Sequence, residues 1–171
     1  MRAFLETLFD IIRLRRGPDA IPCSRFLCLI ALALWLLSGF VFTVMIEGMD
    51  GRDYLVGTFT GVVGLAAYAA AVVLTGRAPR LLQTLTAVLG CAAMLRFAYV
   101  AGSVFLAPFT GVRFAGLLAT LILLWSIPVQ GHIVARALDR HWYVGIVFAM
   151  AVFVSQVYLY WLLNPPAETA A

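Results

Sequence analysis

The residue with the clearest potential for chemistry is Arg96, which interrupts the apolar stretch "AAMLRFAYVAG". A charged side chain at membrane depth costs free energy and usually has a partner or a task. Arg96 lies 16 residues beyond Arg80, and Gln156 lies 14 residues beyond Trp142. At about 1.5 Å per helical residue these separations are roughly 24 Å and 21 Å. We therefore expect Arg96 and Gln156 at similar depth in a membrane.

Three roles for Arg96 stay open. As a structural clamp it would donate hydrogen bonds to Gln156, to carbonyls near helix ends, or to Glu47 or Asp53, while its stem reaches outward. As a binding residue it would hold an anionic headgroup or substrate. A proton or ion pathway is disfavoured because no Asp or Glu is expected inside any apolar run. The sequence favours the clamp.

A second polar group, Gln83, Gln130 and His132, is expected nearer the cytoplasmic side of the third and fourth apolar runs. The segment "WSIPVQGHIVARALDRH" also contains Pro128 and Gly131, which predict a kink with freed carbonyls. A kinked helix that carries Gln and His is compatible with a transport gate. It is equally compatible with packing in which the polar groups satisfy one another.

Signatures of catalysis and metal binding are missing from the sequence. It contains no GxSxG, HExxH, Walker lysine or Gly-rich phosphate loop. The two histidines, His132 and His141, are too few and too poorly spaced for a metal site. The cysteines, Cys23, Cys28 and Cys91, form no CxxC pair and are interpreted as structural. We predict a protein that is not an enzyme and that has no metal or cofactor.

The elements that position these residues are apolar helices. The 171-residue chain is 64% hydrophobic and 12% charged, and its mean hydropathy is +1.01, whereas a soluble domain is about half apolar and a quarter charged. Its apolar runs each approach the roughly 20 residues that a bilayer core requires. We predict an all-α integral membrane protein with spans at about 24–46, 54–75, 81–107, 112–134 and 142–163 and a short outer tail at 164–171. The first span is expected to be an uncleaved anchor.

Residues 1–23 are predicted to form a separate segment. In "RAFLETLFDIIRLRR" apolar residues recur at helical spacing opposite charged ones, which is typical of an amphipathic helix in the headgroup layer or packed on another protein. Arg13, Arg15 and Arg16 at its end suit anionic lipid headgroups. "GPDAIP" then forms a Gly/Pro hinge into the first span.

The arginines predict the orientation of the spans. Nine of the 12 lie before the first span or in the loops after the second and fourth, whereas only Arg52 and Arg113 lie in the other loops. By the positive-inside rule the N-terminus is cytoplasmic and the C-terminus is outside. All basic residues are arginine, which is typical of a GC-rich genome, and we expect a bacterial inner membrane.

The second span carries Gly57, Gly61 and Gly64 on one stripe. Small residues let a second helix approach closely. The stripe would serve packing within the chain, self-association, or contact with another membrane protein, and the sequence does not decide between these.

The stretch "LFDIIRLRRGPDAIPCSRFL", residues 8–27, followed by five close-set spans with the N-terminus inside, resembles small bacterial members of the Yip1-like family. The resemblance covers nearly the whole chain but is mainly architectural, and the DLYGP-type motif of the eukaryotic branch is absent. It implies a non-catalytic protein that shapes, organises or escorts other membrane components.

Two functions are compatible with these observations. The sequence favours a non-catalytic accessory or scaffold subunit of a membrane complex, because it lacks catalytic and ion-coupling residues and has a surface helix and a small-residue stripe. The alternative is a small oligomeric transporter or channel in which Arg96 binds an anionic solute or lipid headgroup. No nucleic-acid partner is expected.

Overall fold

The structure, a computed structural model, describes residues 2–47 and 51–165, and all regular elements in these ranges are helical. The helices are α1 (Arg2–Ile12), α2 (Arg25–Phe42), α3 (Gly51–Leu74), α4 (Leu81–Phe105), α5 (Ala107–Thr110), α6 (Val112–Ala137) and α7 (Trp142–Leu163). The other regular elements are three short helical turns: η1 (Pro18–Ala20), η2 (Thr43–Glu47), which extends α2, and η3 (Ala78–Arg80), which leads into α4.

Five of these helical segments are long and apolar enough to cross a membrane: Arg25–Ile46, Gly51–Leu74, Ala78–Phe105, Val112–Ala137 and Trp142–Leu163. The prediction of an all-helical protein with five candidate spans is therefore confirmed. The second candidate span begins at Gly51 and not at Tyr54, so Asp53 lies in the first turn of α3. Asp53, expected in the loop before this span, thus belongs to the helix, where a negative charge is favourable at the N-terminus.

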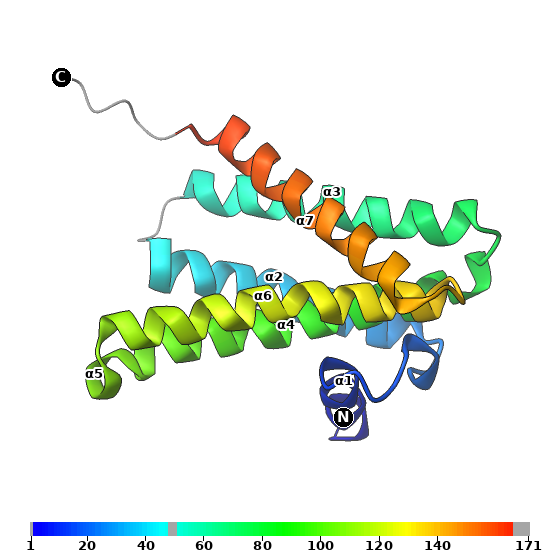
Figure 1. Cartoon of the computed structure of the whole chain (residues 1–171), viewed down its shortest axis with the longest axis horizontal. Helices are drawn as coiled ribbons and strands as arrows, with labels where there is room; N and C mark the ends of the chain where they lie inside the picture. The colour runs from blue at the N-terminus through cyan, green and yellow to red at the C-terminus, as the bar shows by residue number, and fades with distance from the viewer. Residues whose placement is uncertain (1, 48–50, 166–171) are drawn as a thin grey trace.

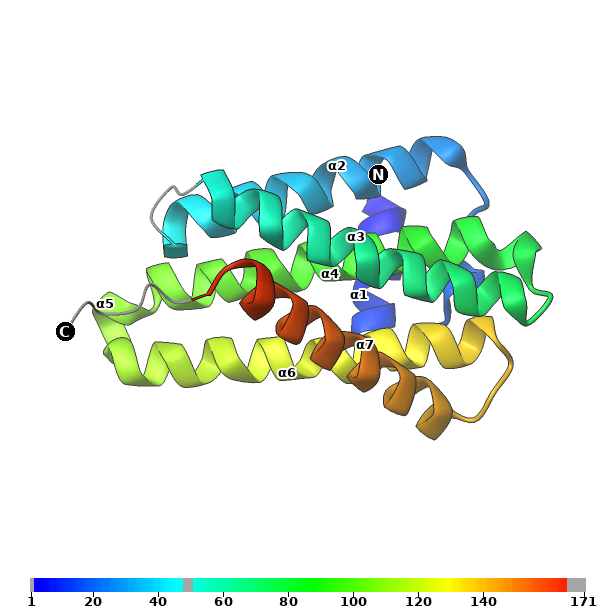
Figure 2. The same cartoon turned by 90° about the horizontal axis from the view of Figure 1, so that it is seen from above.

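The helices form three layers. Figures 1 and 2 show α3 and α7 in one layer, α2, α4 and α6 in the next, and α1 crossing beneath them. α4 lies between α2 and α6 and also contacts α1 and α3. Its buried residues include Ala87, Cys91 and Ala93. Arg96 therefore belongs to the most enclosed of the candidate spans.

The N-terminal helix α1 packs on the bundle through one face. Phe4, Leu8 and Ile11 are buried, whereas Leu5 and Phe9 are about half exposed. The Leu8 side chain lies over Gly90 of α4, where an added Cβ would be 2.8 Å from Leu8 Cδ1. Because glycine leaves this space open, α1 seats against α4 and α6.

Two glycines bring α6 and α7 close together. A Cβ added to Gly131 would lie 2.8 Å from Ile146 Cα, and one added to Gly145 would lie 2.0 Å from the Gly131 carbonyl oxygen. Small residues permit such crossings. Pro128 lies within α6, which continues from Val112 to Ala137.

Ion pairs join two loops at one end of the bundle. Asp139, in the loop between α6 and α7, accepts hydrogen bonds from Arg77 and, at 2.9 Å, from Arg80. These arginines come from the connection between α3 and α4. Asp139 has a φ of 48°, a left-handed conformation that short polar side chains tolerate better than most. The contact fixes the relative position of the loops.

Candidate functional site: a cavity around Arg96

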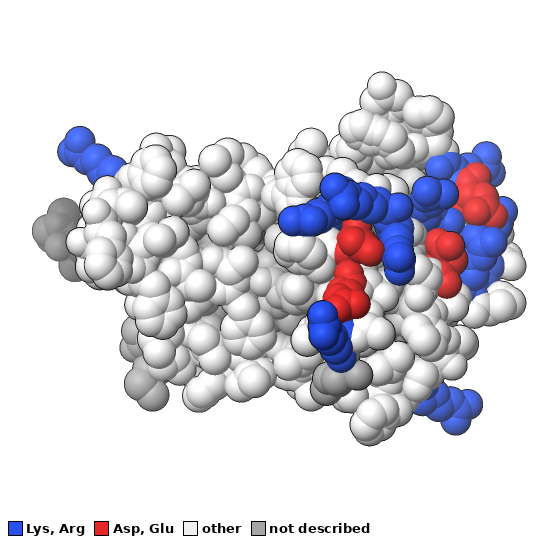
Figure 3. Space-filling view, turned by 90° about the horizontal axis from the view of Figure 1, so that it is seen from below, with Lys and Arg blue, Asp and Glu red and all other residues white. Residues whose placement is uncertain are grey.

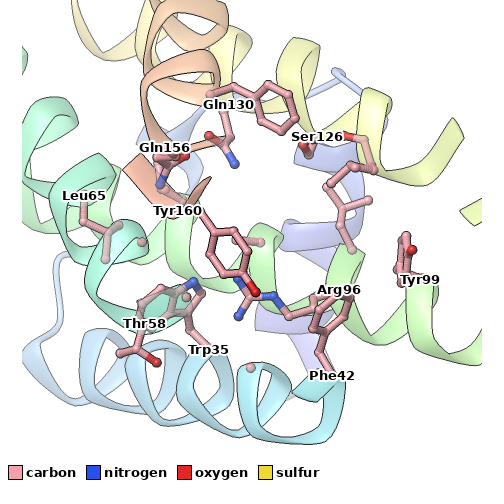
Figure 4. A pocket seen from close by; sticks show the side chains of 18 of the residues that line it. Trp35, Phe42, Thr58, Leu65, Arg96, Tyr99, Ser126, Gln130, Gln156 and Tyr160 are labelled. Carbon is pink, nitrogen blue, oxygen red and sulfur yellow. Dashed lines mark hydrogen bonds between the residues drawn. The ribbon is translucent and has the colours of Figure 1, made fainter. Parts of the chain in front are cut away.

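A cavity of about 320 Å³ lies between the two layers of long helices and receives side chains from α2, α3, α4, α6 and α7 (Figure 4). Its aromatic lining residues are Trp35, Phe42, Tyr54, Tyr68, Tyr99, Phe153 and Tyr160. Its polar lining residues include Asp53, Thr58, Arg96, Ser126, Gln130 and Gln156. Ligand sites commonly combine a mostly apolar wall with a few polar groups in this way.

Arg96 projects from α4 toward α2. Its guanidinium carbon lies 5.6 Å from the centroid of the Trp35 ring, within the range of a cation–π interaction. A Cβ added to Gly39 would lie 3.0 Å from Arg96 Nη1, so this glycine makes room for the guanidinium beside α2. Figure 4 shows Arg96, Trp35 and Tyr160 around the same opening. Arg96 is thus part of the cavity wall.

Gln156 shares the cavity with Arg96 but has a different hydrogen-bond partner. Its Nε2 donates to the Thr60 carbonyl oxygen of α3 at 3.1 Å. The side chain fills the space above Gly64, where an added Cβ would be 2.1 Å from Nε2. Gln156, one of the partners suggested for Arg96, thus reaches across to α3, while Arg96 reaches toward α2.

The second predicted polar group is divided between two places. Gln130 lines the cavity and accepts a hydrogen bond from the Tyr68 hydroxyl. By contrast, Gln83 donates to the Ile21 carbonyl at 2.8 Å, and His132 lies 3.1 Å from the Arg16 carbonyl oxygen. Gln83 and His132 therefore hold the N-terminal segment on the bundle.

Two further side chains hold the same segment. The indole nitrogen of Trp125 on α6 donates to the Ile12 carbonyl at 3.0 Å. The thiol of Cys91 on α4 lies 3.8 Å from the Leu8 carbonyl oxygen, a weak hydrogen bond. Side chains of α4 and α6 thus contact the backbone of residues 8–21 at several points, and they fix where α1 crosses the bundle.

Polar contacts also join α3 and α7 at the Asp53 end of the cavity. Asp53 accepts a hydrogen bond from the Asn164 side chain, and Arg52 donates to the Leu163 carbonyl at 3.1 Å. The Glu47 side chain, suggested as a partner for Arg96, lies outside the described residues. So do residues 48–50 of the acidic loop and residues 166–171 of the outer tail.

The glycines of the predicted stripe face the interior of the same chain. A Cβ on Gly61 would lie 2.4 Å from Trp35 Cζ2, and one on Gly64 would meet Gln156. Gly57 lines the cavity and has no atom within 4 Å of an added Cβ. Self-association through this stripe would require Trp35 and Gln156 to leave their positions.

The described residues were also compared with the requirements of metal and thiol sites. No group of three His, Cys, Asp or Glu side chains there is arranged to hold a metal ion. Cys23, Cys28 and Cys91 are free thiols, of which Cys91 is buried and Cys23 is exposed.

The sequence did not reveal the aromatic wall of the site. Trp35, Tyr54 and Tyr99 come from three helices, and each is unremarkable in an apolar run. Helix rise did place Arg96 and Gln156 at one level. No known protein family, curated protein or solved structure matches the chain.

Proposed function

We propose that the chain is a non-catalytic, multi-pass membrane protein that binds a small solute or lipid headgroup carrying an anionic group in the cavity at Arg96. The observation that supports this is the position of a guanidinium in the wall of a cavity of about 320 Å³. The transporter-like alternative is therefore favoured over a scaffold, because a scaffold needs no internal cavity beside its membrane arginine.

The chemistry of the wall suits this ligand class. A guanidinium forms charge-assisted, often bidentate hydrogen bonds with carboxylate or phosphate oxygens. Trp35 lies near the guanidinium, and the rings of Tyr54 and Tyr99 line the same space. Asp53 is the acidic lining residue and accepts a hydrogen bond from Asn164 at one end of the cavity. A ligand with an anionic group within reach of Arg96 and an apolar body against the rings matches this lining.

Binding can be tested by thermal unfolding of the purified protein with benzoate, phenyl phosphate or the neutral control benzamide. A ligand that binds only the folded state stabilises it by about 2.7 kcal/mol at 100 times its Kd. We expect stabilisation by one or both anions and none by benzamide. Arg96→Gln should weaken anion binding at least about tenfold, because charge-assisted hydrogen bonds contribute about 1.5–3 kcal/mol each.

A second variant keeps the test decisive if Arg96→Gln fails to fold. Gly57→Leu would fill the cavity from a position where nothing lies within 4 Å of an added Cβ. Its control is Gly116→Leu, an equally open glycine on α6 outside the cavity. Equal anion binding by Gly57→Leu, Gly116→Leu and the original protein would contradict the proposal.

The second candidate is an accessory or organising protein, as the Yip1-like resemblance implies. The observation that favours it is the exposed polar surface of α1, where Arg2 pairs with Glu6 and Arg16 with Asp10. Such a surface offers contacts to another protein. Gentle purification that yields a monomer with no accompanying protein would count against this candidate.

For the membrane itself, we propose a bacterial inner-membrane protein with its N-terminus in the cytoplasm. The arginine distribution supports this orientation. α1 crosses the long helices at a steep angle (Figures 1 and 2), and it contacts α4 at Gly90 and α6 at Trp125, roughly 14–18 Å from the ends of these helices at Leu81 and Ala137. We propose that the long side chains of Arg13, Arg15 and Arg16 reach anionic headgroups from there.

A further inference from the structure

The cavity around Arg96 contains a second charged residue, of opposite sign. Asp53 lies in the first turn of α3, is partly buried, and lines the same cavity. By contrast, Figure 3 shows charged side chains gathered on the outside, over α1 and the adjoining end of the molecule, beside a broad uncharged surface. Ionisable residues within apolar helices are rare and indicate a functional site by default. A ligand of this cavity therefore meets both a cation and an anion in its wall.

The surroundings of Asp53 suit a cationic group. The Asn164 side chain donates to the Asp53 carboxylate and, at 3.4 Å, to the Tyr160 hydroxyl oxygen. An ionised carboxylate offers about four acceptor sites, so it can bind an ammonium group as well as Asn164. Tyr54 and Tyr160 line the cavity together with Asp53. A carboxylate beside tyrosine rings attracts an ammonium group through charge-assisted hydrogen bonds and cation–π contacts.

The Tyr54 side chain connects the first turn of α3 with the guanidinium. Its hydroxyl donates to the Leu36 carbonyl at 3.4 Å, so the ring extends from α3 to α2. A Cβ added to Gly39 on α2 would lie 3.5 Å from Tyr54 Cε2 and 3.0 Å from Arg96 Nη1. Tyr54 follows Asp53 directly in the chain. A small molecule that lies along the Tyr54 ring can therefore contact Asp53 with one end and Arg96 with the other.

We propose that the ligand of this cavity is a zwitterion, with its carboxylate or phosphate at Arg96 and its ammonium group at Asp53. Burial of a charge is costly unless the charge is paired. A zwitterion pairs both of its charges with the wall, whereas a simple anion is attracted by Arg96 but repelled by Asp53. The inference rests on the proposed function, the binding of an anionic group at Arg96, and adds recognition of a second charge by Asp53.

Matched ligands test the second charge. The zwitterion para-(aminomethyl)benzoate is compared with para-methylbenzoate, which has nearly the same shape but lacks the ammonium group, and with para-methylbenzylamine, which lacks the carboxylate. Affinities are measured by thermal unfolding of the purified full chain over a range of ligand concentrations. We expect the zwitterion to bind at least about tenfold more tightly than para-methylbenzoate, and para-methylbenzylamine to bind most weakly.

A free solute and a lipid headgroup can carry the same two charges, and a second pair of ligands separates these sources. Short-chain dihexanoyl phosphatidylethanolamine has a phosphate and an ammonium group, whereas dihexanoyl phosphatidylglycerol has the phosphate alone. A preference for the zwitterion within the benzoate pair indicates a free solute, and a preference within the lipid pair indicates a headgroup. Either preference supports the inference.

Three variants assign the two charges of the ligand to their partners. Asp53→Asn keeps an oxygen that accepts from Asn164 but removes the negative charge, so it should weaken binding of the zwitterion about tenfold. Binding of para-methylbenzoate should stay equal or become tighter in this variant. Arg96→Gln should weaken binding of both ligands. The control is Asp139→Asn, an equal charge change in the loop between α6 and α7 outside the cavity, which should alter neither.

The outcomes separate this inference from the proposed function. Equal affinity for zwitterion and anion in both pairs, or a preference that Asp53→Asn does not change, overturns the inference and leaves anion binding at Arg96 standing. Binding of no ligand, or binding that Arg96→Gln does not change, overturns both. If Asp53→Asn does not fold, the matched ligands on the unmodified chain decide: a tenfold preference for the zwitterion supports the inference, and equal affinity overturns it.

Discussion

Gly131 and Gly145 bring the backbones of α6 and α7 into direct contact. A Cβ on Gly145 would lie 2.0 Å from the Gly131 carbonyl oxygen and 2.7 Å from the Ala135 Cβ. Since these neighbours are backbone or methyl atoms on a packed helix, a larger residue cannot be accommodated by rotation of a side chain. This crossing places Gln156 and Tyr160 of α7 over the Arg96 cavity.

Gly145→Ala should therefore destabilise the protein. Overpacking of a tight contact costs about 1–3 kcal/mol, and more when the backbone must move. Thermal unfolding of a fluorescent fusion, followed by size-exclusion chromatography, measures the change. The control is Gly116→Ala on α6, where nothing lies within 4 Å. There alanine should be neutral or stabilising by up to about 1 kcal/mol. Equal stability of the two variants would contradict the tight crossing.

Leu8→Ala should release α1 from the bundle. Leu8 is fully buried over Gly90, and removal of a buried leucine side chain costs about 2–5 kcal/mol. Limited proteolysis of the N-terminal segment, together with thermal unfolding, reports the loss. Leu5→Ala on the same helix, at a side chain that is 44% exposed, should change stability by no more than about 0.5 kcal/mol.

Tyr68→Phe tests a buried polar contact between α3 and α6. The Tyr68 hydroxyl donates to Gln130 and its residue is 2% exposed. Loss of the donor leaves a polar acceptor in an apolar setting, so we expect destabilisation of about 1–3 kcal/mol. A double-mutant cycle with Gln130→Met should show coupling of at least about 0.5 kcal/mol. Strictly additive effects would mean that the two side chains do not interact.

Asp139→Asn should have a small, salt-dependent effect. Asparagine tolerates the left-handed backbone at this position, so the change isolates the charge that Arg77 and Arg80 share. Because the pairs are partly exposed, we expect a loss of no more than about 1 kcal/mol at low ionic strength. The difference should shrink in concentrated salt. Unfolding measured at two salt concentrations checks this, and a large salt-independent loss would refute it.

Cys23 offers a direct test of the proposed orientation. It is exposed, whereas Cys91 is buried. With Cys28→Ser and Cys91→Ala, a membrane-impermeant maleimide should label Cys23 only after the cytoplasmic side becomes accessible. A cysteine-free chain carrying Arg113→Cys, an exposed position at the start of α6, should be labelled in intact cells. The reverse pattern would place the N-terminus outside.

The long apolar helices were predictable because length and hydropathy are local properties of the chain. Their predicted starts and ends agree with the described helices to within a few residues, and the largest consequence of a shift is Asp53. Helix rise also brought Arg96 and Gln156 to one level before any packing was known. Side-chain direction was not predictable, because it depends on which helix lies beside which face.

Gln83 and His132 illustrate what only the tertiary structure decided. Together with Gln130 they were predicted to form one polar group. In the structure the N-terminal segment lies against α4 and α6, so that Gln83 donates to the Ile21 carbonyl and His132 lies beside the Arg16 carbonyl oxygen. Likewise, Gly61 and Gly64 were candidates for a partner helix until Trp35 and Gln156 were seen to fill the space above them. The sequence by itself determined that the chain folds into apolar helices and that one of them carries a charged residue, Arg96, within its apolar stretch. The packing of five helices determined that this arginine faces an aromatic cavity, because contacts between distant segments select which face of each helix is enclosed.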